Sequence, residues 1–159
     1  MLIFSMGEKI KYNFVDFTNS DFEELMTFWE DTGVGGKHRG DNADVISDSV
    51  KNGGRLILMK LEKTNEIIGS AWVTTDKRRT YLHYFAISEE FRGIGLANVL
   101  MDRVMAHAKY LGLQFRLEVH EDNIPALKLY NKYGFEYLGD YNIYINRSIK
   151  KNNLIRIKR

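Results

Sequence analysis

Two glycines follow a strand-like segment near the middle of the chain, and an apolar helical stripe begins directly after them. The segment reads Phe85-Ala86-Ile87-Ser88-Glu89-Glu90-Phe91-Arg92-Gly93-Ile94-Gly95-Leu96-Ala97. A helix N-terminus presents unpaired N–H groups and a partial positive charge, so it suits an anion. Gly93 and Gly95 would let the backbone approach that anion, and Arg92 would add a charged contact. The alternative is that the glycines only form a tight turn.

Known nucleotide motifs and metal motifs do not account for this segment. A P-loop needs Gly-x-x-x-x-Gly-Lys followed by Ser or Thr, which does not occur, and a dinucleotide fingerprint needs glycine where this chain has Asn98. The histidines show neither H-x-x-x-H nor H-E-x-x-H spacing, so we predict no metal site. The chain contains no cysteine. A thiolate nucleophile and a cysteine-bound acyl intermediate are therefore excluded.

Hydrophobic patterns place this segment in a mixed α/β domain around one sheet. Ser20 and Glu23 are spaced as a capping box before the first predicted helix. The predicted helices cover residues 21–29, 42–51, 95–111 and 126–133. The predicted strands cover residues 9–14, 55–61, 66–75, 79–87 and 115–119, followed by a closing pair within 135–149.

Composition and charge limit the function classes. The 159 residues, 44% apolar and 28% charged, predict one globular domain. The net charge of +2 conceals a basic tail, because residues 147–159 hold six Lys or Arg and no acid, and the first 146 residues carry −4. This tail is either solvated or forms a last strand. Because no other part of the chain favours nucleic-acid binding, we expect no nucleic-acid partner. No apolar run approaches the roughly 18–20 residues of a membrane span, so we expect a cytoplasmic protein without a membrane partner.

Two blocks of the sequence resemble the GNAT superfamily of acyl-CoA-dependent N-acyltransferases. Arg92-x-x-Gly95-x-Ala97 matches the Arg/Gln-x-x-Gly-x-Gly/Ala signature of that family. The block Asn123-Ile124-Pro125-Ala126-Leu127-Lys128-Leu129-Tyr130-Asn131-Lys132-Tyr133-Gly134-Phe135 is similar to its Asn-x-x-Ala-x-x-Leu-Tyr-x-x-x-Gly-Phe pattern. The resemblance covers about residues 67–144, roughly half of the chain. It implies a single domain over 1–159 with a mostly antiparallel sheet of about seven strands and about four helices. In this fold the sheet splays between the two strands that flank the long helix.

The resemblance also implies acetyl-CoA as cosubstrate. The pantetheine arm would lie along the backbone of residues 85–87, and the amides of residues 92–97 would hold the pyrophosphate. Asn123 would hydrogen-bond the arm. The expected cofactor-binding set is Phe85, Ala86, Ile87, Arg92, Gly93, Ile94, Gly95, Leu96, Ala97, Asn123, Ala126 and Tyr130.

Acetyl transfer to an amine needs a proton donor and a proton acceptor. The resemblance assigns the general acid to Tyr130, whose alternative role is aromatic packing on its helix. Glu118 is the first candidate for the base, because its strand pattern turns it away from the apolar positions; the alternative is a pair with Arg116, His83 or solvent. His83 is the second candidate, because the ordinary pKa of about 6.5 suits proton transfer. His120 ranks below it.

The resemblance further implies that the acceptor site is formed by the N-terminal helices, the loop between them and the closing strands. The expected contacts are Trp29, His38, Tyr84 and Tyr141. The loop over 33–41 also carries Lys37 and Arg39, which would read a carboxylate or phosphate unless the loop is only solvated.

The sequence thus predicts an acetyl-CoA-dependent N-acetyltransferase that acts in a ternary complex. The expected partners are acetyl-CoA and a small-molecule amine, with a homodimer left open. The alternatives are acetylation of a protein N-terminus or lysine, a non-catalytic acyl-CoA sensor, and a nucleic-acid-binding module that uses the tail.

Overall fold

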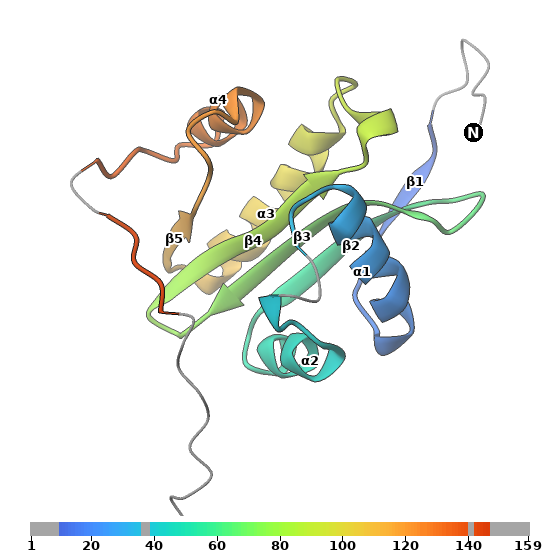
Figure 1. Ribbon diagram of the computed structural model, residues 1–159, viewed down its shortest axis with the longest axis horizontal. Coiled ribbons are helices and arrows are strands. Elements are labelled where there is room, and N and C mark those ends of the chain that lie inside the picture. The colour runs from blue at the N-terminus through green and yellow to red at the C-terminus, as the bar shows by residue number, and fades with distance from the viewer. Residues whose placement is uncertain (1–9, 36–38, 140–141, 147–159) are drawn as a thin grey trace, which may run out of the picture.

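The computed structural model describes residues 10–35, 39–139 and 142–146. They contain one sheet with the strand order β1-β2-β3-β4-β5 and four α-helices (Figure 1). All neighbouring strands are antiparallel except β4 and β5, which are parallel. The strands are β1 (Tyr12–Asp16), β2 (Arg55–Leu61), β3 (Ile67–Thr75), β4 (Arg79–Ile87) and β5 (Gln114–Leu117). The helices are α1 (Phe22–Asp31), α2 (Ala43–Lys51), α3 (Leu96–Leu111) and α4 (Ile124–Lys132).

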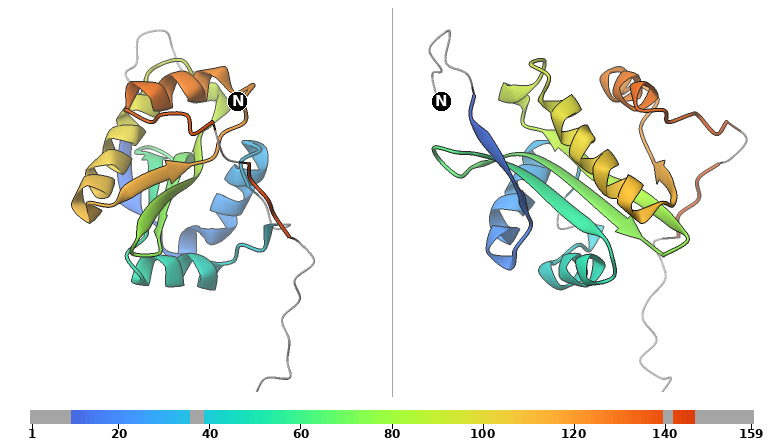
Figure 2. Two further views of the ribbon diagram at one scale, coloured as in Figure 1. Left: turned by 90° about the vertical axis from the view of Figure 1, so that its left-hand side faces the viewer. Right: turned by 180° about the vertical axis from the view of Figure 1, so that it is seen from behind.

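Helices cover both faces of the sheet. Figure 2 shows α3 across one face, with α1 and α2 on the other. Alternate residues of β2 pack into two separate apolar clusters: Ile57 and Met59 join the cluster under α3, whereas Leu56 and Leu58 join the cluster under α1 and α2. A strand that is buried on both faces needs apolar side chains at nearly every position. This requirement explains why the sequence of β2 is almost continuously apolar.

The ends of two helices show how local sequence sets the element boundaries. The predicted capping box of Ser20 and Glu23 was wrong: Thr18 and Asp21 form the box, with the Thr18 N–H 2.8 Å from Asp21 Oδ2. A short 3-10 turn over residues 19–21 precedes α1 and moves the cap toward the N-terminus. Asn42 caps α2 by accepting a hydrogen bond from the Val45 N–H at 3.0 Å.

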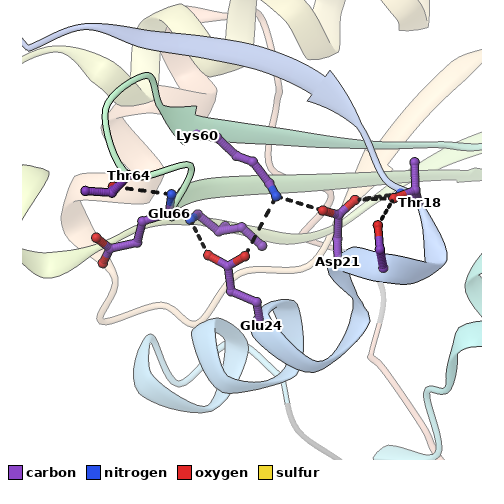
Figure 3. A network of polar contacts seen from close by, with 8 residues as sticks. Thr18, Asp21, Glu24, Lys60, Thr64 and Glu66 are labelled. Carbon is purple, nitrogen blue, oxygen red and sulfur yellow. Dashed lines mark hydrogen bonds and ion pairs between the residues drawn. The ribbon is translucent and has the colours of Figure 1, made fainter.

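A buried lysine joins β2 to α1 (Figure 3). Lys60 is only 5% exposed, and its Nζ lies 2.7 Å from Asp21 Oδ1 and 3.7 Å from Glu24 Oε2. Glu24 also accepts a hydrogen bond from the Ile67 N–H at 2.7 Å. Burial by itself would raise the pKa of Asp21, but hydrogen bonds from Lys60 and Thr18 outweigh it and lower that pKa. Asp21 is therefore ionised at neutral pH, and its bond to Lys60 holds the start of α1 against the sheet.

The prediction of about seven strands was wrong, because the described residues form five. The expected closing strands are absent from residues 135–139 and 142–146, and the rest of 135–149 lies outside the described residues, as does the tail 147–159. Phe135 packs against Phe115 of β5 at a ring distance of 5.3 Å, but the large apolar side chains after it are at least 60% exposed: Tyr137, Leu138, Ile143, Tyr144 and Ile145. A strand needs a paired neighbour and a covered face, and the described residues after Phe135 have neither. The predicted count of four helices is confirmed.

Candidate active site

The strands β4 and β5 separate at the centre of the molecule. Their pairing runs from Arg79 opposite Gln114 to Leu82 opposite Leu117, whereas β4 continues to Ile87. The expected splay between the strands that flank the long helix is present. Two cavities of about 420 and 810 Å³ open at this gap, and Val34, Phe85, Asn123 and Tyr130 line both. The cavities therefore meet where the strands part.

The larger cavity lies at the N-terminus of α3. Gly93 and Gly95 have φ angles of 77° and 91°, a left-handed conformation that favours glycine. A Cβ atom on either glycine would meet no protein atom within 4 Å, so the space beside the turn is open. The Nε atom of Arg92 donates a hydrogen bond to the Ile87 carbonyl at 3.0 Å and ties the turn to the end of β4. Backbone N–H groups at this turn are placed to bind an anion.

Most of the predicted cofactor-binding residues line the larger cavity, but two do not. Ile94 is 57% exposed but does not line the cavity, and Leu96 is 6% exposed in the apolar core. Those that line it are Phe85, Ala86, Ile87, Arg92, Gly93, Gly95, Ala97, Asn123, Ala126 and Tyr130.

Two cationic residues that were not predicted also line the larger cavity, Lys128 and Lys132 on α4. Lys132 Nζ donates a hydrogen bond at 2.6 Å to Oδ1 of Asn98, another lining residue that was not predicted. The spacing of four residues, which places both lysines on one face of a helix, is the signal that would have found them. These cations suit phosphate groups.

Tyr130 stands at the junction of the two cavities. It is 8% exposed, and its ring contacts those of Phe85 and Phe135 edge-on at centroid distances of 6.2 and 5.8 Å. Burial raises the pKa of its hydroxyl to about 12. The hydroxyl is therefore protonated at neutral pH and is a hydrogen-bond donor. Asn123 uses its Oδ1 atom to cap α4, accepting from the Ala126 N–H at 3.3 Å, which leaves its amide nitrogen for a ligand.

A bulge in β4 shapes the smaller cavity. The register against β3 shifts between Ser70 and Trp72, and Tyr84 has a φ of 47°. The rings of His83 and Tyr84, although consecutive, both lie about 6 Å from the ring of Trp72. The extra residue thus turns two neighbouring side chains to the same side of the sheet.

Both base candidates line the smaller cavity. Desolvation lowers the pKa of His83, although the charges of Glu118 and Asp41 partly oppose this, so His83 is neutral at neutral pH. Its Nε2 atom lies 2.9 Å from Thr74 Oγ1. Glu118 is exposed at the cavity wall, directly after the last residue of β5 rather than inside the predicted strand. The structure therefore brings Tyr130, Glu118 and His83 to one cavity.

Of the four expected acceptor contacts, one lines the smaller cavity, one is buried away from it, and two lie outside the described residues. Tyr84 lines the smaller cavity, and its hydroxyl donates a hydrogen bond to Asp41. Trp29 is fully buried beneath Tyr84, at a ring distance of 4.4 Å, and lines neither cavity. His38 and Tyr141 lie outside the described residues.

Among residues 10–35, 39–139 and 142–146, no three side chains of the His, Cys, Asp or Glu types gather into a group that would hold a metal ion. None of the helices described above is long and apolar enough to cross a membrane.

Comparison with known proteins relates this geometry to one family. A family model described as "Acetyltransferase (GNAT) family" matches residues 19–135. A GNAT-family acetyltransferase from Staphylococcus aureus Mu50 superimposes with a TM-score of 0.70 at 19% identity, over 83% of this chain and 90% of that one. A GNAT-family acetyltransferase from Streptococcus pneumoniae gives 0.69 at 18%, over 87% and 94%. A predicted acetyltransferase from Clostridium acetobutylicum, solved with acetyl-CoA, gives 0.65 at 18%, over 86% and 96%.

Proposed function

The chain belongs to the GNAT acetyltransferase family, and we propose that it transfers an acetyl group from acetyl-CoA to a primary amine of a small molecule. The observation that carries this proposal is the meeting of two cavities at Phe85 and Tyr130. One cavity suits a phosphate-bearing cosubstrate and the other suits an acceptor. The smaller cavity, of about 420 Å³, lies within the usual range of small-molecule sites, roughly 300–1,000 Å³.

The larger cavity supplies the groups that acetyl-CoA needs. The N-terminus of α3 and the glycine turn at 93–95 face its pyrophosphate, and Lys128 and Lys132 add positive charge. Beyond Leu82, no strand in the described parts of the chain pairs with β4 on the β5 side. The carbonyls of Tyr84 and Ile87 accept side-chain hydrogen bonds, and the other polar groups of the β4 backbone on that side are available to bind an extended pantetheine arm. Asn123 reaches the same gap from the start of α4.

At pH 7 an amine of pKa about 10.4 is neutral in only roughly one molecule in 2,500, so a base must first take a proton from the ammonium form of the acceptor. In the ternary complex, the neutral nitrogen then attacks the thioester carbonyl carbon; the C–N bond forms, the C–S bond breaks, and the second proton that the nitrogen loses goes to the departing coenzyme A thiolate. The first proton is the one that the base accepts. Glu118 takes it directly or through water, with the neutral His83 as second acceptor. Tyr130 donates a hydrogen bond to the departing sulfur.

Two measurements test this proposal. Thermal unfolding with and without acetyl-CoA should show an increase in Tm with the ligand. A panel of primary amines should release free thiol from acetyl-CoA only when enzyme and amine are both present, with the N-acetylated product identified by mass spectrometry. Stabilisation without thiol release by any amine would favour an acyl-CoA sensor. No stabilisation and no release would overturn the proposal.

A further inference from the structure

Two of the three Arg, Lys, Asp or Glu side chains that line the smaller cavity are basic. They are Arg39 and Arg116, whereas Glu118 is the only carboxylate among its described lining residues. An acceptor that carried only an ammonium group would therefore meet two guanidinium groups and one carboxylate. This balance does not favour polyamines or other purely cationic amines.

The two guanidinium groups come from different walls of the cavity. Arg116 of β5 is in register with Tyr81 of β4, and its guanidinium lies 6.0 Å from the centre of that ring. Arg39, from the connection between α1 and α2, lies 5.7 Å from the ring of Tyr84. Since Tyr81 and Tyr84 are both on β4, one strand carries the aromatic platforms for both cations. Stacking of this kind leaves the edges of a guanidinium group free to bind an anion.

In the part of the chain that the structure describes, neither arginine forms an ion pair with a carboxylate, and Glu118 forms none with a cation, although its charge acts on the nearby His83. Asp41, the nearby carboxylate, already accepts the hydroxyl hydrogen of Tyr84. Arg116 and Glu118 are two residues apart, which along an extended chain is about 6–7 Å. A small molecule with opposite charges at its two ends would bridge that separation.

We infer that the acceptor amine carries an anionic group, a carboxylate or a phosphate ester, a few bonds from its nitrogen. Arg116 and Arg39 bind the anion, and Glu118 faces the amine. This inference rests on the proposed acetyl transfer and names the class of its acceptor.

Matched acceptors test the inference. β-Alanine is compared with propylamine, and O-phosphoethanolamine with ethanolamine, because each pair shares its amine and differs in the anion. The anionic member of at least one pair should have the higher kcat/KM, by about 10- to 100-fold, the usual effect of hydrogen bonds to a charged group. The pair with the larger ratio distinguishes carboxylate from phosphate.

Variants and a binding measurement make the test specific. Arg116→Gln should abolish the preference, and Arg116→Lys should retain part of it because lysine keeps the charge but not the planar fork. Arg78→Gln, an equal charge change outside the cavity, should leave the preference unchanged. Calorimetry with N-acetyl-β-alanine, or the N-acetyl derivative of phosphoethanolamine if that pair has the larger ratio, in the presence of coenzyme A should show affinity about tenfold lower in Arg116→Gln.

The outcomes separate this inference from the proposed function. Equal kcat/KM values within both matched pairs, or product affinity unchanged in a folded Arg116→Gln protein, would overturn the inference while acetyl transfer stands. Failure of every amine to release thiol would instead overturn the proposed function.

Discussion

The indole nitrogen of Trp29 donates a hydrogen bond to the hydroxyl oxygen of Ser70 at 2.9 Å and joins α1 to the middle of β3. The same hydroxyl donates to the carbonyl oxygen of Tyr84 at 2.9 Å. Tyr84 is the bulge residue of β4, with a φ of 47°. One serine side chain therefore connects a fully buried tryptophan to the backbone bend that turns His83 and Tyr84 into the smaller cavity.

Ser70→Ala is expected to weaken both the fold and acceptor binding. It leaves a buried indole N–H and a carbonyl without their partner, which costs about 1–3 kcal/mol of unfolding free energy. Because the bulge loses its tether, the KM of the acceptor should rise while the KM of acetyl-CoA changes little. Ser49→Ala is the matched control, since Ser49 accepts from the other indole, that of Trp72, at 3.0 Å without touching the bulge. Equal acceptor KM values in the two variants would contradict this role of Ser70.

Gly95→Ala is expected to lower both stability and the affinity for acetyl-CoA. A residue with a Cβ atom in the left-handed conformation costs about 1–2 kcal/mol, and here the methyl group would enter the open space of the larger cavity. Gly112→Ala is the control, because Gly112 has a φ of 65° and equally open surroundings at the other end of α3. Urea unfolding should show a similar loss for both variants, and calorimetry should show weaker binding for Gly95→Ala alone. Equal affinity in both would remove Gly95 from the binding site.

Tyr130→Phe is expected to lower kcat by about 10- to 100-fold and to change the KM of acetyl-CoA by less than about twofold. The pKa of Tyr130, raised to about 12, keeps the hydroxyl protonated throughout the accessible pH range, so no alkaline loss of rate should be due to it. Tyr133→Phe is the control, because the Tyr133 hydroxyl binds the Asn98 carbonyl and Asp102 outside the junction. Steady-state kinetics of both variants measure kcat and the KM of acetyl-CoA, and kcat should fall in Tyr130→Phe alone. An unchanged kcat in Tyr130→Phe would exclude a role in the transfer step.

Glu118→Gln is expected to lower kcat/KM and to shift the acid limb of the pH profile of kcat/KM. The charge of Glu118 favours protonated His83, so its removal should lower the pKa of His83 further below the ordinary 6.5. Proton NMR titration of the histidine ring measures this shift directly, and His83→Gln identifies the signal. A pH profile identical to that of the wild type would assign the proton acceptor elsewhere, and an unmoved His83 pKa would contradict the coupling.

Lys60→Met is expected to cost about 3–5 kcal/mol of unfolding free energy at neutral pH, because it leaves the carboxylate of Asp21 buried without its cation. Arg55→Gln breaks the exposed pair with Asp16, at 2.6 Å, and should cost less than about 1 kcal/mol. Since the pKa of Asp21 is lowered in the folded state, the contribution of the pair is complete above the ordinary value of 3.8 and is lost as pH falls through the lower, folded value. Urea unfolding between neutral and acid pH tests both points. Equal losses of unfolding free energy in Lys60→Met and Arg55→Gln would contradict the expectation that the buried ion pair contributes more to stability than the exposed one.

The local elements and the family could be predicted from the sequence, because they depend on residues close together in the chain. The bounds of β2 and β4 agree with their predicted ranges, and α3 ends at Leu111, the last residue of its predicted range. The motifs at residues 92–97 and 123–135 predicted the GNAT family, and the first of them predicted the glycine turn. The two missed lysines of α4 also had a local signal in their spacing.

Other features arise only from contacts between distant segments. The bulge at Tyr84 depends on a hydrogen bond from Ser70 to its carbonyl oxygen, and the buried Lys60 depends on a carboxylate 39 residues away. The closing strands failed as a prediction because an apolar segment becomes a strand only where a sheet edge receives it. Periodicity thus determined which elements form. The tertiary structure decided where β4 and β5 part, and so which side chains meet at the two cavities.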